Sequence, residues 1–307
     1  MGRSSRSAGS TPQLLEFIPE KVRHGTRTFL VRLVLTLAVV TILCSWFVIL
    51  RSYVAHLDCY QVDARTLRPT VLPSWAGPAV RDELSVLPGI PSRFSIMSPG
   101  ICERVAAAFE RNPWVDEVLS VRKVYPRRIL VELRLRRPVA GVLVGEKYYL
   151  VDAAAHRLTP PLDRWPKGPD TLPVLIVSTN LVPSPGKEWT SEDVKAGACV
   201  ARTLLENREK LQTRFAAIDV TNIGGCRSAL TSDILLITDK GTVVKWGRSP
   251  LLVNSPGELT PGEKIIKMIL FEEKRGPLSS YRYVDIRFDN AQHGPRIDSV
   301  ASRGLSN

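Results

Sequence analysis

A continuous apolar run from Thr28 to Leu50 constrains this 307-residue chain more than any other feature of its sequence. The run is long enough to cross the hydrocarbon core of a bilayer as a helix, and its one charged residue, Arg32, lies near one end. Its fifteen Leu, Ile, Val and Phe residues favour insertion by about 7 kcal/mol in sum, against a cost of about 3 kcal/mol at most for the arginine. The sequence therefore predicts a transmembrane helix over residues 28–50 rather than the buried core helix of a soluble protein.

The distribution of basic residues predicts which way this helix crosses the membrane. Arg51 is the only lysine or arginine between the run and Ala64, whereas six precede or open the run. The six are Arg3, Arg6, Lys21, Arg23, Arg27 and Arg32. Because segments rich in basic residues stay inside, we expect residues 1–27 to be a disordered cytoplasmic tail and the rest to be exported. No small-x-small cleavage site follows, so we expect an uncleaved anchor joined by a linker, residues 51–64.

Charge and cysteine content narrow the class of protein further. The formal charge of +12 fits a solvated basic surface, and it would also suit nucleic acid, an anionic membrane or an acidic polymer as partner. The five cysteines form no C-x-x-C pair, so the sequence predicts neither a zinc site nor a thioredoxin-type centre. Four of them follow the span at wide spacing, and we expect mostly free thiols rather than a disulfide framework.

An alternating stretch over residues 112–140 predicts a β-hairpin. Pro113 cannot continue a helix, so the chain turns there into a first strand that ends near Val124. Pro126 sets the turn, and every second residue of the next strand is apolar until Pro138 ends it. The apolar positions are Ile129, Val131, Leu133 and Leu135. One face of this hairpin should therefore be buried, while the other, rich in arginine, should be wet.

Two helices and a strand should precede the hairpin. Residues 67–72 predict a strand, although Pro69 and Pro73 interrupt it. Pro78 is a suitable first residue for one helix, and the Ser98-Pro99 pair is a suitable start for the other. The expected order over residues 65–138 is strand, helix, helix, strand, strand.

The second half of the chain predicts a mixed β domain over residues 139–290. One helix should begin at Thr190 or Ser191, and another at Thr260, which opens an S/T-x-x-E capping box. Strands are expected at 139–144, 147–152, 172–177, 215–220, 228–238, 242–246 and 281–288. The polar residues 291–307 should form a disordered tail.

The final predicted strand has two different faces. Val284, Ile286 and Phe288 would face the core of the domain. The other parity would face outward as Tyr281, Tyr283, Asp285 and Arg287. Nothing after Phe288 is predicted to pair with this strand, so we expect an open sheet edge that could accept a strand from a partner. The alternative is an edge that the C-terminal tail covers.

Taken together, these motifs resemble the POTRA domain and β domain of the bacterial cell-division proteins called FtsQ or DivIB. The matching residues are Pro113-Trp114-Val115, Pro126, Pro138-Val139-Ala140, Tyr149-Leu150-Val151-Asp152 and the closing Tyr283-Val284-Asp285-Ile286-Arg287-Phe288. The family has glutamate where this chain has Arg136. The resemblance implies an α+β fold in which one transmembrane helix precedes a POTRA domain and a mixed β domain, with Trp114 as a packing anchor.

The same resemblance implies a function. It describes a non-catalytic scaffold, anchored in the inner membrane at the division septum with its N-terminus in the cytoplasm. Its partners would be small bitopic division proteins similar to FtsB and FtsL, and a septal peptidoglycan synthase complex. The FtsB-type partner would dock on the last strand, through Tyr281, Tyr283, Asp285 and Arg287.

Two other classes of protein stay open at this stage. A POTRA-bearing export or assembly factor usually carries several repeats and a barrel, which the sequence does not predict. A membrane-tethered envelope enzyme would need a nucleophile with a base or paired carboxylates, and the four histidines lie in predicted tails or loops. We therefore expect no enzyme activity, cofactor, metal, nucleic acid or small-molecule substrate.

Overall fold

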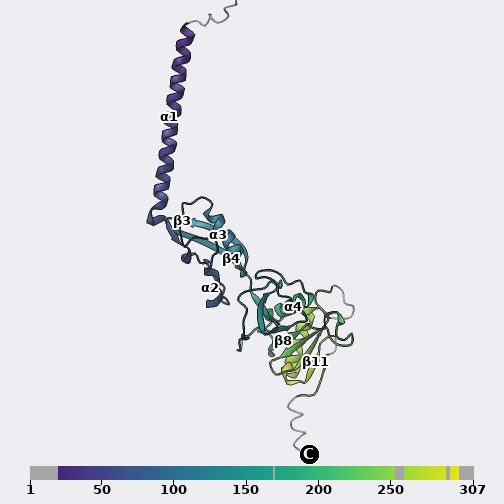
Figure 1. The fold of residues 1–307 in the computed structure, drawn as a ribbon. Coiled ribbons are helices and arrows are strands. Elements are labelled where there is room, and N and C mark those ends of the chain that lie inside the picture. The colour runs from purple at the N-terminus through teal and green to yellow at the C-terminus, as the bar shows by residue number, and fades with distance from the viewer. Residues whose placement is uncertain (1–19, 169, 253–258, 288–290, 297–307) are drawn as a thin grey trace, which may run out of the picture.

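The computed structural model describes residues 20–168, 170–252, 259–287 and 291–296. It is an α+β protein in which a long N-terminal helix leads into a small helix-and-hairpin unit and then into a large mixed sheet (Figure 1). The helix stands at one end of the molecule, and the C-terminal part of the sheet stands at the other (Figure 1). The expected α+β class is confirmed.

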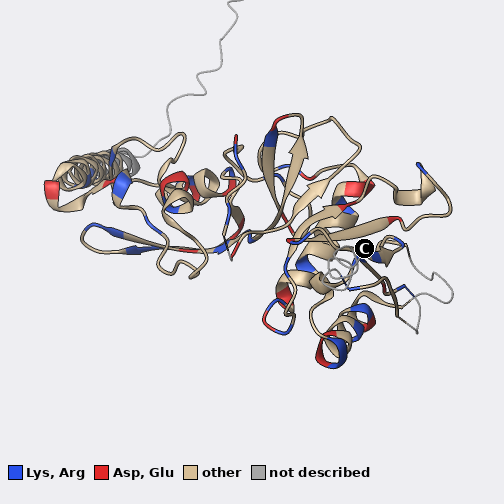
Figure 2. Cartoon of the chain, turned by 90° about the horizontal axis from the view of Figure 1, so that it is seen from below, with Lys and Arg blue, Asp and Glu red and all other residues tan. Residues whose placement is uncertain are grey.

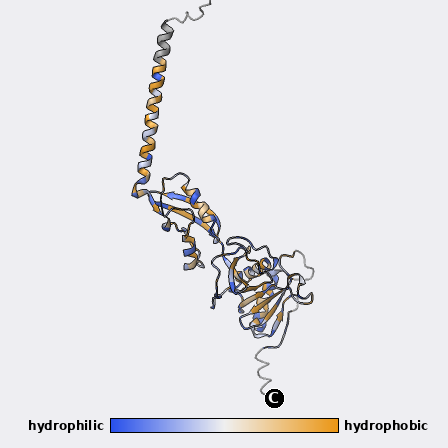
Figure 3. Ribbon diagram, in the orientation of Figure 1, coloured by the Kyte–Doolittle hydropathy of each residue, from blue (hydrophilic) through white to orange (hydrophobic). Residues whose placement is uncertain are grey.

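Helix α1, Glu20–His56, contains the apolar run and continues past Leu50. Its segment Phe29–His56 has a mean hydropathy of 2.7 in its most apolar window, and the side chains of that window are exposed. The residues of this helix are hydrophobic on all of its sides along most of its described length (Figure 3). It is therefore long and apolar enough to span a membrane. Residues 20–27, expected in the disordered tail, belong to α1 instead, and the rest of that tail, residues 1–19, lies outside the described residues.

The small unit begins directly after α1. Its elements are β1 (Gln61–Asp63), α2 (Pro78–Ser85), β2 (Arg93–Ser95), α3 (Ile101–Glu110), β3 (Val115–Val124) and β4 (Arg128–Leu135). Helix α2 begins at Pro78, as expected, and α3 packs against β3 and buries the apolar face predicted for it in the core of the small unit. Residues 61–63, expected in the linker, instead pair with β2 and bury Val62.

The strand expected at residues 67–72 is absent from the described small unit as a regular element. A single parallel bridge joins Pro69 to Val131, and Thr70 N donates to Val131 O at 2.8 Å. Because Pro69 and Pro73 carry no N–H, a longer ladder with β4 cannot form on this segment. The segment still lies beside β4 in the orientation of a parallel strand.

In the described residues the large sheet has eight strands, in the order β12-β11-β10-β9-β8-β7-β5-β6. Their bounds are β5 Pro138–Val144, β6 Lys147–Asp152, β7 Val174–Ile176, β8 Phe215–Asp219, β9 Ile234–Thr238, β10 Val243–Gly247, β11 Tyr283–Asp285 and β12 Gln292–His293. Helix α4, Glu192–Glu206, follows β7, and α5, Pro261–Arg275, follows β10. Both parallel and antiparallel pairs occur, so the sheet is mixed.

One face of this sheet is the core of the molecule. Six residues in register across six neighbouring strands are fully buried there, together with apolar residues of α4 and α5. They are Val142, Leu175, Ile218, Leu236, Val244 and Val284. The next register positions toward the other face, such as Ala217, Ile237 and Val243, are only partly buried. The sheet is therefore covered by helices on one face, and its other face is more open.

A short joint connects the small unit to the sheet. The chain passes from β4 to β5 through Arg136 and Arg137 alone. Arg136 Nη1 lies 3.0 Å from Asp152 Oδ2 and 3.3 Å from Asp116 Oδ1. Trp114 Nε1 donates to Thr159 O at 2.9 Å across the same joint. An ion pair and a hydrogen bond therefore connect the two units in addition to the chain crossing itself.

Candidate functional site

The strand expected to dock a partner is not at the edge of the sheet. β11 lies between β10 and β12, so both of its sides are paired. Gly294 N donates to Tyr283 O at 3.0 Å, and Arg282 N donates to Pro295 O at 3.2 Å. The expectation that no later residue pairs with this strand was wrong, because residues 292–296 return along it. Phe288 and residues 297–307 lie outside the described part of the chain.

The four expected docking side chains do not share one exposed face. Tyr281 is buried, with its ring 5.3 Å from that of Phe271 on α5, and its hydroxyl donates to Arg275 O. Asp285 is buried as well, and only Tyr283, at 38% exposure, presents a large open surface. This corrects the predicted pattern. Its physical reason is that α5 and the returning tail cover the outward parity of the strand near Tyr281.

Asp285 and Arg287 form a bidentate pair at the end of β11. Arg287 Nη2 lies 2.8 Å from Asp285 Oδ2, and Arg287 Nε lies 3.0 Å from Oδ1. Burial alone would raise the pKa of Asp285, but the hydrogen bonds and charge of Arg287, with the charge of Lys245, outweigh it. The pKa of Asp285 is therefore below its ordinary value. These groups stabilise the strand internally, which leaves them less available to a partner than predicted.

The described sheet ends at β12 beyond β11 and at β6 on its other side, and the sequence analysis missed β12. Gln292 and His293 have no apolar alternation, so no local pattern announces a strand. Their pairing depends on packing instead: the His293 ring lies 4.9 Å from that of Tyr281 and 5.8 Å from that of Phe271. Gly294 is the one sequence feature that fits the close approach of this segment to β11, because a Cβ there would come within 2.8 Å of the Tyr283 ring.

The motif residues of the hairpin occupy structural positions. Trp114 and Val115 are buried at 3% and 4% exposure, at the start of β3. Pro126 follows a cis peptide bond in the turn between β3 and β4. Pro138 opens β5 and pairs in register with Asp152. The structure therefore places them in the hairpin and the joint, with none of them in a pocket described below.

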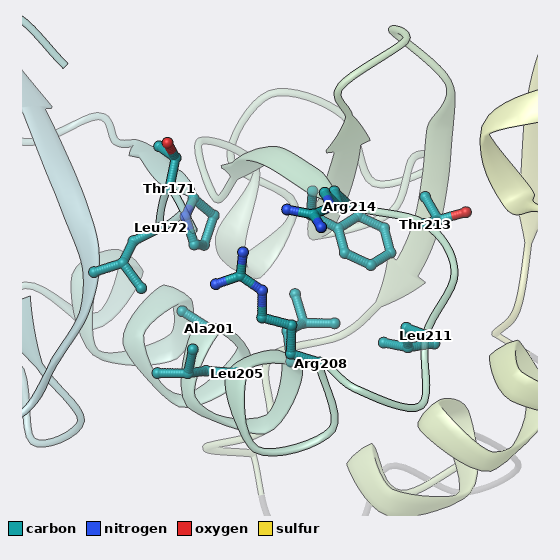
Figure 4. A pocket seen from close by; sticks show the side chains of 11 residues that line it. Thr171, Leu172, Ala201, Leu205, Arg208, Leu211, Thr213 and Arg214 are labelled. Atoms are coloured by element: carbon teal, nitrogen blue, oxygen red, sulfur yellow. The ribbon is translucent and has the colours of Figure 1, made fainter. Parts of the chain in front are cut away.

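A depression of about 460 Å³, its open mouth included, lies beside α4 (Figure 4). Its lining comes from α4, from the segment before β7 and from the start of β8. The side chains of Arg208 and Arg214 extend into it above an apolar floor, and Arg208 lies 3.3 Å from Asp170 (Figure 4). The floor consists of Ala201, Leu204, Leu205, Leu211 and Phe215. Such a lining suits an anion with an apolar part.

The described lining of this depression contains no histidine or carboxylate that could activate Thr171 or Thr213 as a nucleophile. Within the described ranges, no group of three or more His, Cys, Asp and Glu side chains could hold a metal ion. The five cysteines are free thiols, and Cys102 and Cys199 are partly buried, whereas Cys44, Cys59 and Cys226 are exposed. Burial raises the pKa of the Cys199 thiol, despite the opposing charge of Arg202.

These features define a class of protein: an α+β chain whose N-terminal helix is long and apolar enough to span a membrane and precedes a large mixed sheet. No protein-family model matches the chain, and no curated protein matches it.

Proposed function

We propose that this protein is a membrane-anchored, non-catalytic scaffold that binds other bacterial division proteins at the septum. In this proposal the small unit is a POTRA domain and the large sheet is the β domain of an FtsQ or DivIB-type protein. The N-terminus lies in the cytoplasm, and both units lie outside the inner membrane. The partners are small bitopic proteins similar to FtsB and FtsL, together with a septal peptidoglycan synthase complex.

The order of elements in the small unit supports this proposal. Helices α2 and α3 precede the β3–β4 hairpin, and residues 69–70 run parallel to β4 in the place of a first strand. The added pair β1–β2 differs from the order that the resemblance implies. This departure lies at the end next to α1 and leaves the hairpin and both helices in the expected sequence.

The observation that carries the proposal is the position of the β12 edge. Among the described residues the sheet ends there with a strand of two residues, paired to β11, which lies in the part of the molecule away from α1 (Figure 1). An edge strand offers unpaired backbone donors and acceptors to an incoming strand. A partner strand anchored in the same membrane could extend outward and add to this edge.

The place of the protein in the cell tests the division reading. A fluorescent fusion to the full chain in growing cells should form a band at mid-cell when the septum forms. An even distribution around the cell membrane would contradict a septal scaffold, and it would favour an export factor or a membrane-tethered enzyme.

Docking at the β12 edge can be tested by removing a backbone N–H donor from this strand. Gly294 N donates to Tyr283 O, so the backbone of Tyr283 pairs with the β12 segment, and proline there would disturb a ladder inside the protein. Since strand residues alternate, the backbone N–H of His293 points away from β11. His293→Pro removes that donor, and His293→Ala removes the same side chain while it keeps the donor.

We expect His293→Pro to lose co-purification of the bitopic partners. His293→Ala should retain more of it, because it removes the same ring from Tyr281 and Phe271 but keeps the backbone donor. If both variants bind alike while folded, the partner docks elsewhere on the protein.

A further inference from the structure

A basic pocket lies where the small unit meets the end of α1. It encloses about 1160 Å³, open mouth included, and it is lined by residues from the start of the small unit and from the β3–β4 turn. They are Asp58, Gln61, Val62, Asp63, Thr66, Arg93, Arg127 and Arg128. Asp58 and Gln61 follow α1 directly, so the turn of the hairpin lies next to the point where the helix ends.

The charges of this pocket favour an anion. Three arginines face two aspartates, and all three arginines are exposed. Within the described part of the chain, none of these guanidiniums pairs with a carboxylate. One oxygen of the Asp63 carboxylate already has a partner, because Oδ1 accepts a hydrogen bond from Arg65 N. Guanidinium groups bind phosphate oxygens well, through bidentate hydrogen bonds.

The turn next to this pocket is amphipathic. Val124 is 39% exposed and Tyr125 is 59% exposed, beside Arg127 and Arg128. Basic residues follow the hairpin to the side of the molecule at which α1 is seen end on (Figure 2). Tyrosine is enriched at membrane interfaces, where its ring lies among headgroups and its hydroxyl stays wet. The turn therefore carries both an interfacial aromatic side chain and basic side chains.

The length of α1 determines how far the pocket lies from the hydrocarbon core of the membrane. Arg51 marks the outer end of the apolar run, and His56 ends the helix about 8 Å further on, at 1.5 Å per residue. The headgroup layer on each side of a bilayer is roughly 5 to 8 Å thick. The helix therefore ends at the surface of the headgroup layer, and the pocket that begins at Asp58 lies against that layer.

We propose that the tip of the β3–β4 hairpin and the adjoining pocket bind the phosphate groups of anionic phospholipids in the membrane that α1 crosses. Arg93, Arg127 and Arg128 bind the phosphates, and Tyr125 lies among the headgroups. This contact fixes the small unit against the bilayer. The inference rests on the membrane-spanning role of α1, but it needs no division partner.

Depth-dependent quenching tests the contact on the full chain in lipid nanodiscs that contain acyl-brominated phosphatidylglycerol. Tyr125→Trp places a new fluorophore at the tip, and Leu230→Trp places one at a 93% exposed position in the sheet unit. The unsubstituted chain has six tryptophans and provides the baseline, and the quenching that is lost in Trp46→Phe reports insertion of α1. We expect strong quenching of the tryptophan at position 125 and little at position 230. Equal quenching at both positions would overturn the proposal.

The lipid preference tests the role of the arginines. Native mass spectrometry of the full chain gives the ratio of phosphatidylglycerol-bound to lipid-free protein, with phosphatidylcholine for comparison. Arg127→Gln and Arg128→Gln should each lower the phosphatidylglycerol ratio about fivefold. Arg81→Gln on α2 and Arg104→Gln on α3 remove exposed arginines outside the pocket, and they should leave the ratio unchanged. Equal losses in both pairs would show nonspecific charge attraction and refute the site.

These outcomes separate this proposal from the proposed function. If Trp46 is not quenched, α1 does not span the bilayer, and both proposals fail. If Trp46 and the tryptophan at position 125 are quenched but no septal band forms, the lipid contact stands and the division reading fails.

Discussion

At the scale of single residues, Arg136 is the main ionic contact at the joint between the two units. Its side chain is 15% exposed and pairs with Asp152, which is 8% exposed. His156 Nδ1 lies 2.9 Å from the same guanidinium nitrogen, and Arg136 N donates to Trp114 O. The resemblance has an acidic residue at this position, so the charge that departs from the family pattern is the one that connects the small unit to the sheet.

Arg136→Gln should destabilise the protein strongly. It leaves the Asp152 carboxylate buried without its cation, which typically costs about 3 to 5 kcal/mol. Denaturant unfolding measures the loss, and Arg137→Gln is the matched control because Arg137 is exposed and next in sequence. An equal effect of both substitutions would mean that the ion pair contributes nothing beyond net charge.

Trp114 contributes packing and one hydrogen bond, and these can be separated. Trp114→Ala should cost about 3 to 5 kcal/mol of unfolding free energy, because a large buried side chain is lost. Trp114→Phe keeps most of the ring and loses the bond to Thr159 O, for about 1 kcal/mol. Thermal unfolding of both variants checks this order. An unchanged melting temperature for Trp114→Ala would point to an exposed contact residue instead.

The stability that Asp285 provides depends on pH in a defined direction. Its pKa is lowered in the folded state, so its contribution is present above the unfolded pKa and is lost as pH falls through the folded pKa. Asp285→Asn should therefore cost about 1.5 to 3 kcal/mol at pH 7. The difference from the parent should shrink at pH values below 3.8, the ordinary value for aspartate. A gap that stays constant across the acid range would show that charge plays no part.

At the scale of elements, helix α5 has the clearest start in the chain. Thr260 Oγ1 accepts from Glu263 N, and Glu263 accepts from Thr260 N, as the capping box requires. These hydrogen bonds from Thr260, first its backbone and then its side chain, keep the pKa of Glu263 below its ordinary value. Thr260→Ala should lose about 1 kcal/mol in denaturant unfolding, and Thr260→Ser should retain most of it. Equal losses for both would mean that the cap is inactive.

The elements that could be predicted from sequence have their cause within a few residues. Pro78, Thr260 and the alternation from Ile129 to Leu135 each determine a helix start or a strand face by local chemistry. The segment at 67–72 was harder, because its prolines oppose a ladder that tertiary packing still brings beside β4.

The elements that could not be predicted depend on distant partners. β12 exists because Tyr281 and Phe271 receive His293, and β1 exists because Phe94 returns to pair with Val62. The predicted docking strand was the part most affected by such distant contacts. The sequence correctly predicted that Val284 and Ile286 face the core. It did not predict the burial of Tyr281, which α5 and the tail cover.

At the scale of the whole molecule, orientation in the membrane is the property to check first. The charge bias around α1 predicts an inner N-terminus, so a reporter that is active only after export should work when it is fused after Asn307. A reporter active only in the cytoplasm should fail at the same position. The reverse result would place both units inside and would contradict the proposed scaffold.

The short crossing from β4 to β5 has a mechanical consequence for the whole chain. The connection is two residues long, and the contacts of Arg136 and Trp114 hold the two units together next to it. A force applied at β12 would therefore be transmitted to α1, whereas a long flexible linker between the two units would extend and transmit less of it. In a protein whose α1 spans a bilayer, pulling at β12 would tilt that helix.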